Sequence, residues 1–449
     1  MLELTSLGHA TLLVRSAVAS ILCDPILGDA VSGGGNVVRP PRTVHVEGLP
    51  ALDAILISHH HSDHFSIGDL ALIPRIRDQR IFAPEGSSVI DELRRFGCSR
   101  VEPLHVSRPF LVGDISVVPT PSAVDFPEVG FLFRSNGISA LNLVDSQIHG
   151  MMDSILAITE GAVDLVLAPF QAGGYMSLLP LRVGGAPLGL KEAILRWSEE
   201  YTEEIVADLA LIKPRFVVPF ADGLLYRDEG INSWHFPLSD EVFLDRMARF
   251  GIAGCSCAPG IVFAVSSSGV EIRTSTSRII GTESGQGSTR AFNPNVSLRD
   301  VPMSCADWNP ALKTDEPEGN LADQDELLKS MVESNLSAAL QSTDEASVTD
   351  RVFNWFLEFC DRPECMKYLY VDRSGESFRV RLGDERPALR EYGIRLHRKD
   401  LLHLLHGRIL LEHITLGGAF RYHSPREVDD LERIRGRVLG PFYTILGLN

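Results

Sequence analysis

Cysteine is scarce in this chain, and long apolar runs are missing. The seven cysteines are scattered without a CxxC pair, so they cannot assemble a four-cysteine zinc site or an iron–sulfur site. An odd number of dispersed thiols is typical of a reducing compartment, and we expect a cytoplasmic protein. No apolar run approaches the roughly 20 residues that cross a bilayer, and the first residues lack the basic start of a signal peptide. We therefore expect no membrane contact.

Basic side chains are also under-represented. The 42 Lys and Arg residues are outnumbered by 59 Asp and Glu residues, which gives a net charge of −17. Proteins that bind nucleic acid or anionic lipid surfaces need a basic face, so we expect neither kind of partner. The hydrophobic fraction of 44% is that of a globular protein with a sizeable core, and 449 residues are enough for two domains.

Alternation of short apolar runs with turn residues predicts an α/β domain over residues 1–280. Its strand-like runs are interspersed with helix-like stretches at 87–96 and 191–212, and this mixture favours a layered arrangement. Residues 281–325 are rich in Gly, Ser, Asn, Pro and charge, and they predict a linker or a wrapping segment. Residues 326–449 predict a smaller α+β domain, with helices at 326–340, 348–359 and 398–407 and a hairpin at 368–382.

Histidine is rare as well, but four of the 14 histidines stand within HHHSDH, residues 59–64, directly after the apolar run AILIS. Alternation at the end of a buried strand places His59 and His61 on one side, where they can share one metal ion. Asp63 and His64 then turn toward a second ion nearby. A lone histidine is more often structural than a ligand, whereas this spacing after a strand predicts a metal site.

The stretch SHHHSDH resembles the signature of the metallo-β-lactamase superfamily. LGHATLLV, with His9, and ILCDP, with Asp24, are similar to its N-terminal strands, and NLVDSQ stands where the family has a bridging aspartate, here Asp145. The resemblance covers residues 1 to about 275. It implies an αββα metallo-β-lactamase sandwich of the α/β class with a dinuclear site at one edge, to which the C-terminal α+β domain is added. It also implies that His9 and Asp24 support the ligands from behind.

Two positions depart from the family pattern. The segment VVPTPSAVDFPEVGFLF has no histidine where the third ligand is expected, and Asp125 falls at or beside that place. The segment VVPFADG offers Asp222 where the last histidine is expected. The resemblance therefore implies that two imidazoles have become carboxylates, with His149 and His235 as alternative ligands. A metal-free relative is the other interpretation, and the intact HHHSDH motif argues against it.

Exchange of nitrogen for oxygen ligands favours iron or manganese over zinc. The sequence is similar to the non-haem di-iron monooxygenase branch of the superfamily, which includes platensimycin/platencin-type diterpenoid hydroxylases. FVVPFADG also resembles the corresponding domain of CMP-N-acetylneuraminate hydroxylase, although this chain lacks that family's Rieske pattern. The resemblance implies two Fe ions and O2 as co-substrate. One ion would be held by His59, His61 and Asp125, the other by Asp63, His64 and Asp222, with Asp145 as the bridge.

The expected reaction is hydroxylation of a C–H bond in a small, largely apolar metabolite of antibiotic biosynthesis. A terpenoid-like acid, or its carrier- or CoA-linked thioester, would suit it, with electrons from an external reductase. The alternative is a hydrolase of the lactonase or esterase type that uses Zn or Mn, with Asp63 as proton acceptor. A third interpretation is a binding or scaffold protein with a relict site. The sequence does not indicate which residues bind substrate.

The C-terminal stretch from GIRLHRKDLLHLLHG to GGAFRYHSP resembles the helix-then-strand end of sterol-carrier-like domains. This resemblance implies a pocket for an apolar or amphipathic molecule. A packing or dimerisation module is the alternative, and it would make the chain a homo-oligomer.

Overall fold

The structure is a computed structural model of the whole chain. It describes residues 1–161, 163–170, 180–181, 190–228, 231–232, 238–275, 278–282, 304–308, 320–342, 355–361, 367–374, 377–384, 392–406 and 420–423, with the single residues 312, 408, 442 and 446.

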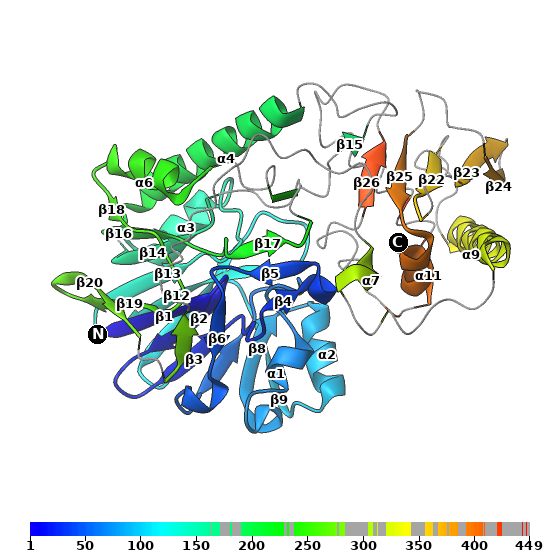
Figure 1. Cartoon of the computed structure of the whole chain (residues 1–449). Helices are drawn as coiled ribbons and strands as arrows, with labels where there is room; N and C mark the ends of the chain where they lie inside the picture. Colours follow the sequence, from blue (N-terminus) through cyan, green and yellow to red (C-terminus); the bar gives the residue numbers. More distant parts are fainter. Residues whose placement is uncertain are drawn as a thin grey trace.

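Two mixed β-sheets form the centre of the N-terminal part (Figure 1). In sheet order, the eight strands of the first are β20 (Gly269–Thr274), β19 (Ile261–Ser266), β1 (Leu2–Gly8), β2 (Thr11–Arg15), β3 (Ser20–Cys23), β7 (Ala54–Leu56), β8 (Arg80–Pro84) and β9 (Arg100–Leu104). The seven strands of the second are β10 (Phe110–Val112), β11 (Ile115–Pro121), β12 (Val129–Ser135), β13 (Ile138–Asn142), β14 (Leu165–Ala168), β16 (Phe216–Pro219) and β18 (Ala253–Gly254).

Helices cover the outer faces of both sheets, because the parallel strand pairs need crossover connections. On the first sheet lie α1 (Ile67–Leu70) and α2 (Ser88–Phe96), and on the second lie α3 (Met152–Thr159), α4 (Leu190–Ile212) and α6 (Asp240–Ala248) (Figure 1). Helix α2 begins after Ser87, whose hydroxyl accepts a hydrogen bond from the Val89 N–H at 3.3 Å, and it ends at Gly97 with φ 99°.

Shorter elements complete this part. They are the 3-10 turns η1 (Ser32–Gly34), η2 (Val46–Gly48) and η3 (Ile76–Asp78), the small sheet of β17 (Leu224–Tyr226), β5 (Asn36–Val38) and β4 (Ala30–Val31), and the pair β21 (Ile280–Thr282) and β6 (Arg42–Val44).

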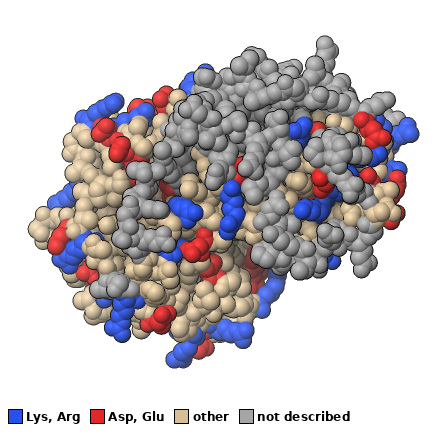
Figure 2. Space-filling model, viewed as in Figure 1, with Lys and Arg blue, Asp and Glu red and all other residues tan. Residues whose placement is uncertain are grey.

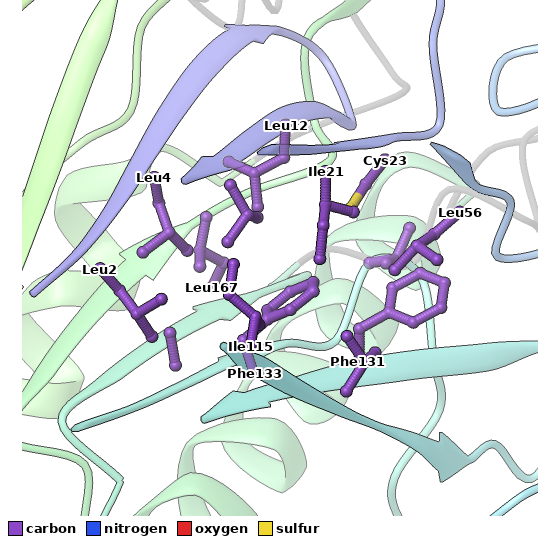
Figure 3. Packing of buried hydrophobic residues seen from close by; sticks show 14 of the residues in the cluster. Leu2, Leu4, Leu12, Ile21, Cys23, Leu56, Ile115, Phe131, Phe133 and Leu167 are labelled. Carbon is purple, nitrogen blue, oxygen red and sulfur yellow. The ribbon is translucent and has the colours of Figure 1, made fainter. Parts of the chain in front are cut away.

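Alternation along the strands fills two kinds of core. Leu12 and Ile21 point between the sheets toward Phe131 and Phe133 (Figure 3), whereas Leu13 packs outward under the helices. Both faces of each sheet are therefore apolar, as expected where helices cover a sheet from outside. This four-layer arrangement confirms the αββα sandwich predicted from the sequence.

The C-terminal part is a six-stranded sheet. Its strands, in sheet order, are β15 (Pro180–Leu181), β26 (Phe420–His423), β25 (Tyr392–Leu396), β22 (Trp355–Phe359), β23 (Lys367–Ser374) and β24 (Ser377–Gly383). It shares a core with residues of α7 (Cys305–Trp308), α9 (Leu321–Ser342) and α11 (Arg398–Leu405).

One expectation for the C-terminal part needs correction, and one of two alternatives is favoured. Residues 355–359 form a central strand rather than the end of a helix, and all five are buried because β22 is paired on both sides and covered on both faces. Within the segment predicted as a linker, Cys305, Trp308 and Leu312 belong to the buried C-terminal core. The wrapping alternative fits these three residues better than a free linker does.

No helix in the described part of the chain is long and apolar enough to cross a membrane. On the face shown in Figure 2, acidic and basic side chains of the described residues are intermixed.

One buried arginine, Arg42, forms hydrogen bonds with the end of β1 and with the loop after β3. The Arg42 guanidinium donates hydrogen bonds to three carbonyl groups, those of Leu7 at 2.9 Å, Ile26 at 2.7 Å and Gly28 at 2.8 Å. It also pairs with Asp29 at 2.9 Å, and its side chain is fully buried. Because a carbonyl that loses a buried partner pays the full cost of desolvation, this contact stabilises the end of β1.

We predict that Arg42→Met lowers the free energy of unfolding by about 2–4 kcal/mol, since it leaves several buried carbonyls without donors. Urea denaturation followed by circular dichroism measures this loss. The matched control is Arg80→Met, which removes a part-exposed pair with Glu102 and should cost less than about 1 kcal/mol. Equal losses of unfolding free energy in the two variants would contradict the stabilising role of the Arg42 hydrogen bonds.

Candidate metal centre

The histidines and acids of the predicted site meet at one edge of the sandwich, where strands of both sheets end. Asp24 directly follows β3, and Asp145 lies three residues after β13. His9 occupies the turn between β1 and β2, and His59 lies three residues after β7. Glu128 immediately precedes β12. Residues distant in the sequence are therefore brought to one edge.

His59 and His61 face each other across a short gap. Nε2 of His59 lies 3.0 Å from Nδ1 of His61, the separation expected for two nitrogens about 2.1 Å from one ion at roughly a right angle. Nδ1 of His59 is 2.9 Å from the Ser58 hydroxyl, which fixes the ring. Burial, with the neighbouring His64 and His61, holds the pKa of His59 well below its usual value, so the ring is neutral and available as a ligand.

Glu128 is the buried carboxylate beside this pair. Its Oε2 lies 3.7 Å from Nδ1 of His59, and the Ser122 hydroxyl donates a hydrogen bond to its Oε1 at 2.6 Å. Burial raises the pKa of Glu128 to about 7, an effect that the Ser122 hydrogen bond opposes and the charge of Asp145 increases. Among the described residues its only ion-pair partner is His59. A bound cation would supply the missing positive charge.

His64 is held from one side and faces the centre with the other. Its Nδ1 lies 3.0 Å from Oδ2 of Asp24. The Ser58 hydroxyl donates a hydrogen bond to the same oxygen, and the Ser58 N–H donates one to Oδ1 of Asp24. Its Nε2 lies 3.2 Å from Oδ2 of Asp145. Burial lowers the pKa of His64, but Asp145 and Asp63 outweigh it and raise that pKa well above its usual value. A carboxylate behind a histidine is the usual support of a metal-binding ring.

Two groups of described side chains have donor atoms close enough to hold an ion. One is His59, His64 and Asp145, and the other is His9, Asp63 and His64. His64 belongs to both groups, so the sites adjoin. The chemistry of the donors, imidazole nitrogen and carboxylate oxygen at one edge of the sandwich, fits a centre of two ions.

Several predicted ligands are not brought into this cluster. Asp125 is exposed, whereas Glu128, three residues later, is the buried carboxylate beside His59. His149 is also exposed and pairs with Asp208 at 3.3 Å, so it points away from the centre. Asp222 lines a small pocket with His9 but is not among the donor groups above. His235 lies outside the described residues.

Three residues near the centre were not predicted as site residues. Glu128 could be found only from its place before an apolar strand. Phe126 covers the histidines, with ring centroids 5.0 Å from His61 and 5.2 Å from His60. Tyr201 of α4 is in the field of Asp145 and Glu128, and its burial, with these charges, raises the pKa of its phenol far above the usual value. Phe126 provides an apolar wall beside the cluster.

Residues 19–196 match the family model described as β-lactamase superfamily domain. These residues, less than half of the chain, are therefore similar to a β-lactamase superfamily domain. The αββα sandwich around it is the metallo-β-lactamase fold, and the HHHSDH cluster lies within the matched residues.

Curated relatives match only part of the chain. An uncharacterised protein of Mycobacterium tuberculosis is 31% identical over 121 residues, which are 26% of this chain and 32% of the relative. The N-acyl-phosphatidylethanolamine-hydrolyzing phospholipase D 1 of Caenorhabditis elegans is 36% identical over 87 residues, 18% of this chain and 24% of the relative. The matches thus span about a third or less of these relatives.

Solved structures are similar over somewhat more than half of the chain. The di-iron β-hydroxylase CmlA from Streptomyces venezuelae is 19% identical over 57% of this chain and 53% of its own, with a TM-score of 0.42. The isothiocyanate hydrolase from Delia radicum gut bacteria is 18% identical over 59% of this chain and 99% of its own, with a TM-score of 0.39.

We predict that Glu128→Gln lowers the affinity for divalent metal at least about 10-fold, because it removes a buried charge next to His59 without changing the side-chain volume. Titration of metal-free protein with Co2+ in a calorimeter measures this affinity. Asp125→Asn is the matched control and should leave the affinity unchanged. If Asp125→Asn weakened binding and Glu128→Gln did not, the original assignment of Asp125 would be restored.

Proposed function

We propose that the chain is an O2-dependent di-iron monooxygenase that hydroxylates a C–H bond of a largely apolar metabolite. The observation that carries the proposal is the buried carboxylate of Glu128 beside His59, where zinc hydrolases of this superfamily would have a third imidazole. Carboxylate oxygens favour harder, redox-active ions such as iron over zinc.

The charge of the donor set also favours iron over zinc. The carboxylates of Glu128, Asp63 and Asp145 contribute three negative charges within or beside the cluster. Two divalent ions would bring four positive charges, of which the three carboxylates would offset three, and the same carboxylates would partly offset the charge added when the ions are oxidised. A mostly imidazole shell, which serves zinc hydrolases by acidifying bound water, would carry less negative charge.

A bound di-iron centre would bind O2 and transfer electrons to it. The overall reaction inserts one oxygen atom into a C–H bond: R–H, O2, two electrons and two protons give R–OH and water. The electrons would come from an external reductase, since the sequence has no Rieske ligand pattern.

The chain's own residues have defined parts in this proposal. His59, His61 and Glu128 would hold one ion, and His64 and Asp63 the other, with Asp145 between them. Asp24 keeps Nε2 of His64 directed at the centre through the bond at Nδ1.

The apolar wall beside the centre supports an apolar substrate. The Phe126 ring lies against His60 and His61 and gives one side of the cluster an apolar surface. A terpenoid-like acid, or its carrier- or CoA-linked thioester, is the substrate class that we propose, in a natural-product pathway.

We predict about two iron ions per chain in protein produced without added zinc, and consumption of O2 after anaerobic reduction. Metal analysis and an oxygen electrode measure the two quantities. His61→Ala should reduce O2 consumption at least about 100-fold, because it removes a nitrogen ligand. His105→Ala, at a part-exposed histidine paired with Glu85, is the control and should behave as the unaltered protein does. A colourless, zinc-loaded protein that hydrolyses lactones or esters without O2 would reject the proposal and support the hydrolase alternative.

A further inference from the structure

We infer that His9 is a direct ligand of the second ion, next to Asp63 and His64, in the role that the resemblance assigns to Asp222. The inference rests on the metal centre of the proposed function. It changes the expected part of His9, which the sequence suggested only as a support behind the ligands.

The backbone holds His9 in an unusual conformation. The register between β1 and β2 shifts between Ser6 and Gly8, and His9 has φ 48°, which few residues other than glycine adopt. Gly223 packs directly on it, since a Cβ at that position would lie 2.7 Å from Cα of His9. Such strain persists where surrounding structure enforces it, and it is common at functional sites.

The imidazole of His9 has a polar partner only on the side that faces the centre. Its side chain is only 3% exposed, its Nε2 pairs with Oδ2 of Asp63 at 3.2 Å, and its Nδ1 has no hydrogen-bond partner among the described residues. A histidine that positions a ligand donates one ring N–H to a fixed acceptor, as the bond between His64 and Asp24 shows. His9 has no such acceptor behind Nδ1 among the described residues, so a purely supporting role does not account for its position.

Polar atoms of two other residues converge on the same point. Oδ1 of Asp63 is buried without a hydrogen-bond partner among the described residues, and Nε2 of His64 lies 3.7 Å from Oδ2 of Asp63 and 3.2 Å from Oδ2 of Asp145. Nε2 of His9 lies 3.2 Å from Oδ2 of Asp63, and the rings of His9 and His64 have centroids 5.2 Å apart. Two nitrogens and a carboxylate that meet in this way are a donor set for one cation.

With His9 as a ligand, the two ions would have similar surroundings. His59, His61 and Glu128 would hold the first, and His9, His64 and Asp63 would hold the second, with Asp145 available to both. Each ion would then have two nitrogens and two carboxylates, without a contribution from Asp222.

The test compares metal stoichiometry in His9→Gly and Asp222→Asn. Glycine is chosen because it adopts the positive φ of position 9 without strain. Metal-free proteins are loaded with Co2+, passed through a desalting column and analysed for cobalt, and visible absorption reports the coordination of each ion. We expect two ions in the unaltered protein and in Asp222→Asn. In His9→Gly we expect one ion, or a second ion bound at least about 100-fold more weakly.

Added imidazole distinguishes a ligand from a packing residue. In His9→Gly, millimolar imidazole should restore the second ion and its absorption, because the free ring can occupy the space left by the side chain. Retention of two tightly bound ions in His9→Gly, with O2 consumption intact, overturns this inference alone. An unaltered protein that binds one ion regardless of His9 overturns the inference and the di-iron function together. Two ions that depend on His9, without any O2 consumption, support the ligand assignment and reject the monooxygenase.

Discussion

One electrostatic constraint governs the edge of the sandwich: acids and imidazoles are buried together there without a basic side chain. Among the described residues, no Lys or Arg forms an ion pair with Asp63, Glu128 or Asp145. The pKa values consequently split, with Glu128 raised to about 7 and Asp63 held well below its usual value by His64 and His9 against the effect of burial. Burial of uncompensated charge is expensive, so the arrangement is best satisfied by cations.

The scaffold holds this costly arrangement through backbone strain and buried hydrogen bonds. Asp24 and Val144 both have positive φ values, 43° and 54°, and Val144 is β-branched, for which this region is especially unfavourable. The side-chain oxygen of Asn142 accepts a hydrogen bond from the Val144 N–H at 3.0 Å, which fixes the turn that presents Asp145. These turns follow strands that are packed in apolar cores on both faces. The packing of the sandwich therefore stabilises the turns that carry the site residues.

What the sequence could predict is what lies close together along it. HHHSDH could be interpreted as a metal-binding motif because its histidines and aspartate stand within six residues of one another directly after a strand. The site role of Glu128 could not be predicted from the sequence, because the position of Glu128 depends on a hydrogen bond between the sheets. The Val129 N–H donates this bond to the Ser58 carbonyl at 3.1 Å. Exposed Asp125 is only three residues away and has the same charge, so the pattern could not separate them.

Contacts between residues distant in the sequence also explain why the position of His9 and the strand at 355–359 were not predicted. His9 is about 50 residues from HHHSDH, and its approach depends on the irregular register of β1 and β2. The strand at Trp355–Phe359 is apolar at nearly every position, and such a run has no periodicity that distinguishes a buried strand from a helix. Only its pairing with β23 and β25 determines which structure it adopts.

The C-terminal part is connected to the metal loop through a short series of contacts. Trp308, in the C-terminal core, packs so closely on η1 that a Cβ at Gly34 would lie 3.2 Å from its ring. In the same turn, the hydroxyl of Ser32 lies 3.3 Å from that of Ser62, inside HHHSDH. The parallel pairing of β15 with β26 is a second connection between the parts. These contacts join the C-terminal part to the loop that carries Asp63, so the surroundings of the site include residues from both parts of the chain.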